Sequence, residues 1–308
     1  MPGKSLVHLN TNAASWARRL AGALAAAAPS SDGVYLYCTG GWAEEPLSAS
    51  AVGALSEAFD CVPSTAPMLD VVPLLPAAGW TTQAVSALSD VDTAVLLDEE
   101  GDGLAIDGGC LARVQAARTA AGLAAWPASP AAPPIERPAV ARPDAGNPGG
   151  ALSYAAVAAG GTFDRLHAGH RLLLAVTALA CTRTVYLGVA SDQLLANKKN
   201  AHLLWSFDRR AAAAADYIRA VRPSLDVEVS ALVDPKAPPK AATMASITAL
   251  VISRETVGGG RRVQEMRREA GIDEPLDLVL VDLVGAASQA ADAPKLSSSG
   301  LRESEAND

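Results

Sequence analysis

Residues 154–170 read YAAVAAGGTFDRLHAGH, and this stretch decides the fold of the second half of the chain. Tyr154–Ala159 is a short apolar run of the kind that forms a buried strand. Two glycines come after the run, and a segment with helical spacing of apolar residues then extends from about Gly169 to Cys181. A strand that passes through a glycine-rich turn into a helix is typical of nucleotide-binding α/β units.

The same stretch places reactive side chains where the predicted strand ends. Gly160 and Gly161 let the backbone approach a ligand closely, because they carry no side chain. The start of the helix offers free N–H groups and a positive dipole end to phosphate. His167 and His170 lie at that end and can donate hydrogen bonds to phosphate oxygens as charge develops during transfer. Either histidine alone could be a capping or packing residue, but the strand, GGTFD and HxGH together favour a nucleotide site.

Apolar strands and helices alternate along the rest of this half. Strands are predicted at Thr184–Ala190, Asp226–Leu232, Ala249–Ser253 and Leu278–Val284, and helices at Asp208–Val221 and Arg261–Ala270. Short apolar strands separated by helices imply a doubly wound parallel sheet, an α/β fold of Rossmann-like type. Such sheets bind ligands at the carboxyl ends of their strands, where the HxGH motif lies.

The first half has a similar alternation but contains no chemical motif. Strands are predicted at Leu6–Leu9, Val34–Cys38, Leu69–Leu75 and Thr93–Leu97, and helices at Ala13–Ala27, Ser48–Phe59 and Gly109–Ala124. Seven prolines between Trp126 and Gly150 predict an extended linker. We therefore expect a smaller N-terminal α/β domain over residues 1–126, a linker over 127–151 and a second domain over 152–308.

Charge is divided unevenly between the two halves. The net charge is −8, and Met1–Ala151 contains seven Lys or Arg against fifteen Asp or Glu, whereas the remainder contains eighteen of each. The second half therefore suits a phosphate pocket but is not basic enough for a nucleic-acid surface. The four cysteines form no CxxC pair, which argues against a zinc site or a disulfide framework. No apolar run is long enough to span a membrane.

Residues 1–28 contain Arg18, Arg19 and no acidic residue, as mitochondrial transit peptides do. The periodic pattern favours a strand and a helix of the folded domain instead. We expect a cytoplasmic protein and leave mitochondrial targeting as an alternative.

The GTFD segment and the HxGH motif resemble the nucleotidylyltransferase superfamily. Three later segments are similar to its phosphopantetheine adenylyltransferase branch of eukaryotic type, namely LLANKK at 194–199, VISRET at 251–256 and KLSSSGLR at 295–302. The resemblance covers residues 154–302, and the first half weakly resembles the N-terminal region of bifunctional coenzyme A synthases. The resemblance to phosphopantetheine adenylyltransferases implies transfer of the adenylyl group of ATP to 4′-phosphopantetheine, which gives dephospho-coenzyme A and pyrophosphate. Mg²⁺ is expected to accompany ATP.

The resemblance also implies roles for individual residues. His170, His167 and Lys198 would be catalytic, and Thr162, Lys198 and Arg254 would bind the acceptor substrate. Nucleotide binding would involve Gly160, Gly161, Phe163, Gly169, Ser297, Ser298 and Ser299. Lys199 could substitute for Lys198, and a solvated basic loop is the alternative for both lysines. No protein ligand to the metal is expected, because Mg²⁺ would bridge phosphate oxygens mostly through waters.

Two further expectations concern the segments around these residues. Gly258–Gly260 is expected to form a turn, and Gly258 stands where an arginine usually precedes the family's glycine pair. Arg254 could therefore be a plain surface residue instead of a substrate ligand. Asp164 is expected to brace its loop, with a contact to the adenylate as the alternative.

Other functions remain open at this point. The same chemistry could act on another phosphate, as in cytidylyltransferases or nicotinamide mononucleotide adenylyltransferases, although the cytidylyltransferase segment R-T-x-G-(I/V)-S-T-(S/T) is absent. A catalytically silent binding or scaffold protein would explain the motif-free first half but not the intact HxGH, lysine and serine segments. A class I aminoacyl-tRNA synthetase would need a KMSKS-like loop, and a dephospho-coenzyme A kinase would need GxxxxGK(S/T); the sequence contains neither. The oligomeric state is open.

Overall fold

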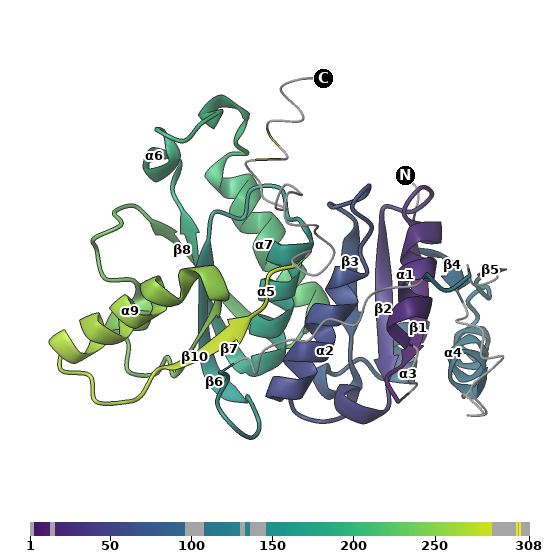
Figure 1. Cartoon of the computed structure of the whole chain (residues 1–308). Helices are drawn as coiled ribbons and strands as arrows, with labels where there is room; N and C mark the ends of the chain where they lie inside the picture. The colour runs from purple at the N-terminus through teal and green to yellow at the C-terminus, as the bar shows by residue number, and fades with distance from the viewer. Residues whose placement is uncertain are drawn as a thin grey trace. The chain divides into compact units, whose positions relative to one another are not determined.

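The computed structural model describes residues 3–12, 16–95, 108–129, 133–135, 146–284, 300 and 302. The chain forms two compact units, one made of Met1–Pro46 and Glu57–Ala139 and the other of Leu47–Ser56 and Val140–Asp308 (Figure 1). Each unit contains a wholly parallel sheet with helices between its strands, which confirms the expected α/β fold class. The domain boundaries expected from the sequence stay a prediction.

The first unit is built on a five-stranded sheet with the order β3-β2-β1-β4-β5. Its strands are β1 (Lys4–Asn10), β2 (Gly33–Thr39), β3 (Asp70–Leu74), β4 (Val91–Val95) and β5 (Ala128–Ser129). Helices α1 (Trp16–Ala27), α3 (Thr82–Ser86) and α4 (Gly108–Ala120) belong to this unit, whereas α2 (Ala49–Asp60) contains residues of both units. The strand β5 lies in the stretch expected to be a linker, where Ala128 pairs with Ala94 of β4.

The second unit is built on another five-stranded sheet, with the order β10-β9-β6-β7-β8. Its strands are β6 (Tyr154–Gly161), β7 (Cys181–Ala190), β8 (Asp226–Leu232), β9 (Ala249–Ser253) and β10 (Asp277–Val281). Its helices are α5 (Ala168–Ala180), α6 (Asp192–Leu195), α7 (Phe207–Val221), α8 (Lys240–Thr243) and α9 (Val257–Glu269). The first strand of the unit, β6, is central and pairs with both β7 and β9. The order of the strands therefore reverses at β6, which makes its carboxyl end the switch point of the sheet.

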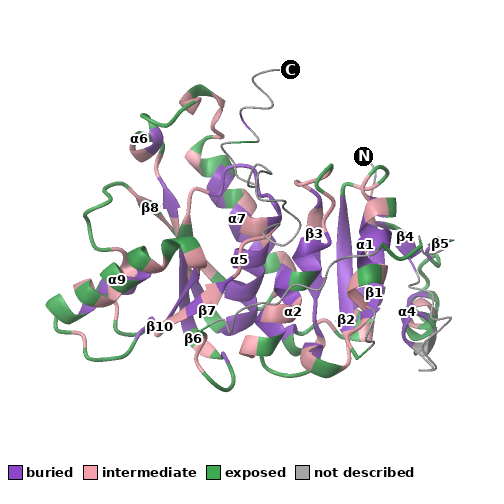
Figure 2. Cartoon of the chain, in the orientation of Figure 1, coloured by how far each residue is buried: buried purple, intermediate pink, exposed green. Residues whose placement is uncertain are grey.

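Helices cover both faces of this second sheet. Helix α5 packs against β6 and β7 and beside α7, and most of its residues are buried (Figure 2). Ala156 and Ala158 of β6 instead pack in a cluster with Ala241 of α8 and Val263 of α9. Because successive strand side chains point to opposite faces, Val157 lies on the other face of β6. The core of this unit therefore holds β6 rigidly from both sides, and the loop after β6 extends from a fixed support.

The prediction of a turn at Gly258–Gly260 is wrong, because these residues belong to the start of helix α9. The three glycines have no left-handed backbone angles. A Cβ atom on Gly260 would lie 2.6 Å from Cδ1 of Ile252 and 3.1 Å from Cδ2 of Leu278. Gly260 therefore lets α9 approach the sheet closely, and packing, not a turn, accounts for the glycine at this position.

The free side of β10 is occupied by a side chain. The Asn147 amide donates a hydrogen bond to the Leu280 carbonyl oxygen at 3.2 Å and accepts one from the Leu280 N–H at 2.6 Å. One side-chain amide thus satisfies both backbone groups that Leu280 would offer to a further strand. Among the described residues, no helix combines the length and apolar character that crossing a membrane requires.

Candidate active site

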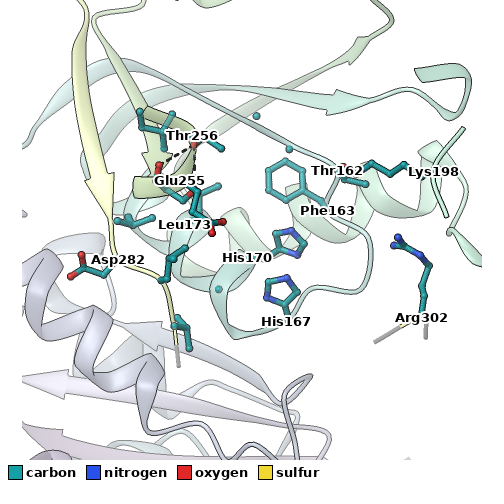
Figure 3. A pocket seen from close by; sticks show the side chains of 18 residues that line it. Thr162, Phe163, His167, His170, Leu173, Lys198, Glu255, Thr256, Asp282 and Arg302 are labelled. Carbon is teal, nitrogen blue, oxygen red and sulfur yellow. Dashed lines mark hydrogen bonds between the residues drawn. The ribbon is translucent and has the colours of Figure 1, made fainter. Parts of the chain in front are cut away.

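A cavity of about 320 Å³ opens at the carboxyl ends of β6, β9 and β10 (Figure 3). Its walls come from the β6–α5 loop, the first turns of α5, the segment after α6, the ends of β9 and β10, and Arg302. This is the switch point of the sheet, where folds of this type bind ligands. Its volume lies at the lower end of the range for small-molecule sites.

Most residues predicted for the site line this cavity. They are Gly160, Gly161, Thr162, Phe163, His167, Gly169, His170 and Lys198. Arg254 is not among the lining residues, and Ser297, Ser298 and Ser299 lie outside the described residues. Segments that are distant in the sequence, such as those of His167 and Lys198, are thus brought to one cavity.

The two histidines lie face to face at the start of α5. His167 is the residue before the first helical turn, and its ring stacks on that of His170 with 4.0 Å between centroids and 24° between planes. Burial disfavours the charged ring and lowers the pKa of His170 to about 4, although a hydrogen bond with the Arg165 backbone acts in the opposite direction. His170 is therefore neutral near pH 7, with one ring nitrogen that carries a proton and one that carries a lone pair. Within the described chain its buried Nδ1 has no hydrogen-bond partner, so the ring has capacity left for a ligand.

At two of the predicted glycines, a side chain would crowd a neighbouring aromatic ring. A Cβ on Gly161 would lie 3.0 Å from Cζ of Phe163, and a Cβ on Gly169 would lie 3.2 Å from Cε1 of His167. Gly160 differs, because its nearest contact would be an ordinary 3.5 Å from the Gly188 carbonyl oxygen. Gly161 and Gly169 thus make room for the motif's aromatic rings, in addition to lining the cavity.

Asp164 is fully buried and holds three chain segments together. Its carboxylate accepts hydrogen bonds from Arg165 Nη1 at 3.0 Å, from the Trp205 N–H at 3.0 Å and from Arg302 Nη1 at 2.7 Å. The residues on either side, Phe163 and Arg165, have φ angles of 52° and 50°, which non-glycine residues adopt at a cost. Asp164 is not among the cavity-lining residues. Its contacts fit a bracing role, in which one carboxylate stabilises a strained loop.

One side of the cavity is basic. Lys198 Nζ donates to Thr162 Oγ1 at 3.3 Å, and Arg302 lies on the same side of the two imidazoles (Figure 3). Partial burial, and then the positive charge of Arg302, lower the pKa of Lys198. An anion bound between the two cations would relieve their repulsion. Arg302 belongs to the KLSSSGLR segment, but no role was predicted for it from the sequence. Only 2% of its surface is exposed, and this burial becomes visible only in the folded chain.

The opposite side combines polar, acidic and apolar groups. Glu255, Thr256 and Asp282 lie there (Figure 3), and the apolar residues Ile252 and Val281 also line the cavity. Arg254 turns to Asp282, with Nε 2.5 Å from Oδ1, so its guanidinium neutralises a wall residue. No role was predicted for these lining residues from the sequence, although the position of Glu255 and Thr256 just after a predicted strand was a usable signal. Since acidic groups repel phosphate, phosphates are expected on the Lys198 side.

Comparison with known proteins agrees with this geometry. Residues 158–304 match the cytidylyltransferase-like family, which places the second unit in the class of nucleotidyltransferases. The phosphopantetheine adenylyltransferase of Methanothermobacter thermautotrophicus is 36% identical over 49% of this chain and 85% of its own length. That of Thermococcus kodakarensis is 34% identical over 42% of this chain and 76% of its own length.

The chain therefore belongs to the phosphopantetheine adenylyltransferase family, a family of nucleotidyltransferase enzymes, which confirms the resemblance seen in the motifs. The phosphopantetheine adenylyltransferase of Saccharomyces cerevisiae is 35% identical over 155 residues. The chain spans 50% of the length of that yeast relative, and the match covers 50% of this chain.

Proposed function

We propose that this protein transfers the adenylyl group of ATP to 4′-phosphopantetheine, forming dephospho-coenzyme A and pyrophosphate. The proposal rests on one observation above all. Two stacked imidazoles at the start of α5 lie in a cavity with Lys198 and Arg302 on one side, in a chain of the phosphopantetheine adenylyltransferase family. Helix N–H groups, imidazole N–H groups and cations are the groups that stabilise phosphates during transfer.

In the proposed reaction a phosphate oxygen of 4′-phosphopantetheine attacks the α-phosphorus of ATP. A new P–O bond forms to the α-phosphorus, and the bond from the α-phosphorus to the oxygen that bridges to the β-phosphorus breaks. Pyrophosphate leaves with that electron pair. The attacking phosphate is already ionised near neutral pH, so the reaction needs no general base. Catalysis then consists of positioning and charge stabilisation.

The protein groups divide between the two substrates. His170 donates to the α-phosphate as its charge grows, and His167 contacts the nucleotide phosphates. Thr162 and Lys198, which already contact each other, hold the attacking phosphate. The nucleotide lies along the glycines and Phe163, and the serine segment 297–299 binds its β- and γ-phosphates. Arg254 reaches a substrate only by extending or exchanging its ion pair with Asp282.

Mg²⁺ enters as part of the MgATP substrate. The ion would be carried by the phosphate groups of ATP and by water, so no protein carboxylate is required to hold it. When bound, it would supply positive charge that offsets the charge of the leaving pyrophosphate.

The decisive test is pyrophosphate release by the purified full chain with Mg²⁺–ATP. Release is measured without acceptor and with 4′-phosphopantetheine, nicotinamide mononucleotide or phosphocholine. The proposal requires release that depends on 4′-phosphopantetheine, with dephospho-coenzyme A identified by mass.

The remaining outcomes separate the alternatives. Release with another phosphate alone would reassign the acceptor while keeping the adenylyl-transfer site. If the protein binds ATP but releases no pyrophosphate with any acceptor, it is a catalytically silent nucleotide-binding protein and the proposal is wrong.

A further inference from the structure

Arg210 is a fully buried cation for which the proposed reaction has no use. It lies in the first turns of α7 with 0% of its surface exposed. Its Nη1 donates to the Thr162 carbonyl oxygen at 2.7 Å, its Nη2 to Asp192 Oδ1 at 2.7 Å and its Nε to the Trp205 carbonyl oxygen at 2.9 Å. A buried guanidinium is tolerated only with such a set of partners, because the loss of water around a charge is costly.

The partners of Arg210 belong to the two segments that supply the basic side of the cavity. Thr162 lies at the end of β6 and presents its hydroxyl to Lys198. Asp192 is the first residue of α6, and the Lys198 N–H bonds to the Leu195 carbonyl oxygen at the end of that helix. One rigid, planar guanidinium therefore connects the backbone of Thr162, whose hydroxyl contacts Lys198, with the short helix that ends three residues before Lys198.

The connection is anchored at further points. Asp192 also accepts the Phe207 N–H at 3.1 Å, which ties α6 to the start of α7. The hydrogen bond to Arg210 is the largest cause of the lowered pKa of Asp192. Trp205 is held at both backbone groups, since its carbonyl accepts from Arg210 and its N–H donates to Asp164. These contacts fix the end of β6 and the start of α6 relative to α7.

We propose that Arg210 is a positioning residue, which holds Thr162 and Lys198 at the separation needed to grip the attacking phosphate of the acceptor. This inference rests on the proposed function, because the role of the Thr162–Lys198 pair comes from it. A purely structural role for Arg210 would predict a general loss of stability. A positioning role predicts a larger loss of acceptor binding than of ATP binding, because Arg210 bonds directly to the Thr162 backbone, whereas its link to the Asp164 loop runs indirectly through Trp205.

The test uses the full chain and three variants. Arg210→Lys keeps the charge but is unable to make three bonds in one plane. Asp192→Asn removes the carboxylate at a position where 60% of the side chain is exposed, so this variant should fold. It keeps the test available if Arg210→Lys fails to fold. Arg219→Gln is the matched control, since Arg219 is an exposed residue of the same helix that pairs only locally with Asp216 at 3.2 Å.

Two readouts are measured for each variant. The first is KM for 4′-phosphopantetheine and for ATP in the pyrophosphate assay. Arg210→Lys should raise the acceptor KM by roughly 10- to 100-fold and change the ATP KM far less, with a smaller shift in the same direction for Asp192→Asn. The second is amide hydrogen exchange in segments 160–166 and 192–200, which should accelerate in both segments for these two variants and in neither for the control.

The outcomes separate this inference from the proposed function. Parallel rises in both KM values, or faster exchange confined to α7, would overturn the positioning role. Wild-type protein without acceptor-dependent release would overturn the proposed function alone. The bridge between the two segments would then be judged by hydrogen exchange, which needs no turnover.

Discussion

The two units of this chain share one topology and differ in the loop after their first strand. Counted within each unit, both sheets have the order third, second, first, fourth, fifth, and all strands are parallel. Strand β6 ends in two glycines, and after it come the strained loop and the paired imidazoles at the start of α5. Directly after β1, the described residues Thr11 and Asn12 bond within the chain: Thr11 Oγ1 donates to the Gly40 carbonyl at 2.6 Å, and the Asn12 N–H to Asn10 Oδ1 at 3.0 Å. A shared topology thus supplies a position for a site, and the loop residues supply its chemistry.

The largest expected effect compares one histidine from each unit. His170→Ala should lower kcat by about 10²- to 10³-fold while changing the dissociation constant of ATP little, because the contact strengthens in the transition state. His8→Ala is the matched change in β1, where Nε2 contacts Thr39 Oγ1 at 2.9 Å, and should leave kcat unchanged. Steady-state kinetics and equilibrium ATP binding check both. A similar fall in kcat for the two variants would break the comparison.

The next effect compares the two adjacent lysines of the second unit. Lys198→Met should raise the KM for 4′-phosphopantetheine by about tenfold, since it removes a cation beside Thr162. Lys199→Met should change that KM by less than about twofold, because Lys199 is exposed and is not among the residues that line the cavity. Initial rates at varied acceptor concentration provide the measurement. Equal effects would mean that the two lysines substitute for each other.

A smaller effect compares neighbouring glycines at the end of β6. Gly161→Ala should destabilise the second unit by about 1–3 kcal/mol, because the new methyl group would press on the buried Phe163 ring. Gly160→Ala should cost well under half as much, since its nearest contact is already at an ordinary distance. Urea unfolding followed by circular dichroism measures both. Equal costs would show that strand propensity decides, not the space beneath the ring.

The smallest effect is the dependence of stability on pH. The folded pKa of His170, about 4, lies below the ordinary value of 6.5, so the unfolded chain binds a proton first as pH falls. This one group should therefore remove about 1 kcal/mol of stability between pH 6.5 and pH 5.5. His170→Asn should lose that contribution to the slope, and His8→Asn should keep it. Urea midpoints at the two pH values decide, and an unchanged slope in His170→Asn would contradict the assignment.

Much of the architecture could be predicted because apolar periodicity reflects local geometry. The runs at β6, β7, β8 and β9 match the folded strands within three residues at each end. The short elements α3, α6 and α8 were not predicted, since four or five residues carry no measurable period. Helix α9 was predicted to begin at Arg261 and begins at Val257, because close packing of Gly260 on Ile252 outweighs the turn preference of three glycines.

The site divides in the same way. The glycines, His167 and His170 could be found because they occupy one continuous segment with a recognisable spacing. Glu255 and Asp282 come after strands that are distant in sequence, and only the sheet brings them to the cavity. Arg210 appeared as one more charged residue of an amphipathic helix, and its complete burial depends on Thr162 and Asp192 being adjacent in space.

The bond between Asp164 and Arg302 also has a consequence for the time at which the site becomes complete. These residues are 138 positions apart, and their hydrogen bond joins the loop after the unit's first strand to the last residue that the structure describes. During synthesis from the N-terminus, the β6–α5 loop emerges long before its arginine partner, and contacts of such long range form late. A nascent chain that already holds its parallel sheet would still lack the cation that completes the loop. We expect substrate binding to be acquired only after Arg302 has emerged, later than the parallel sheet itself.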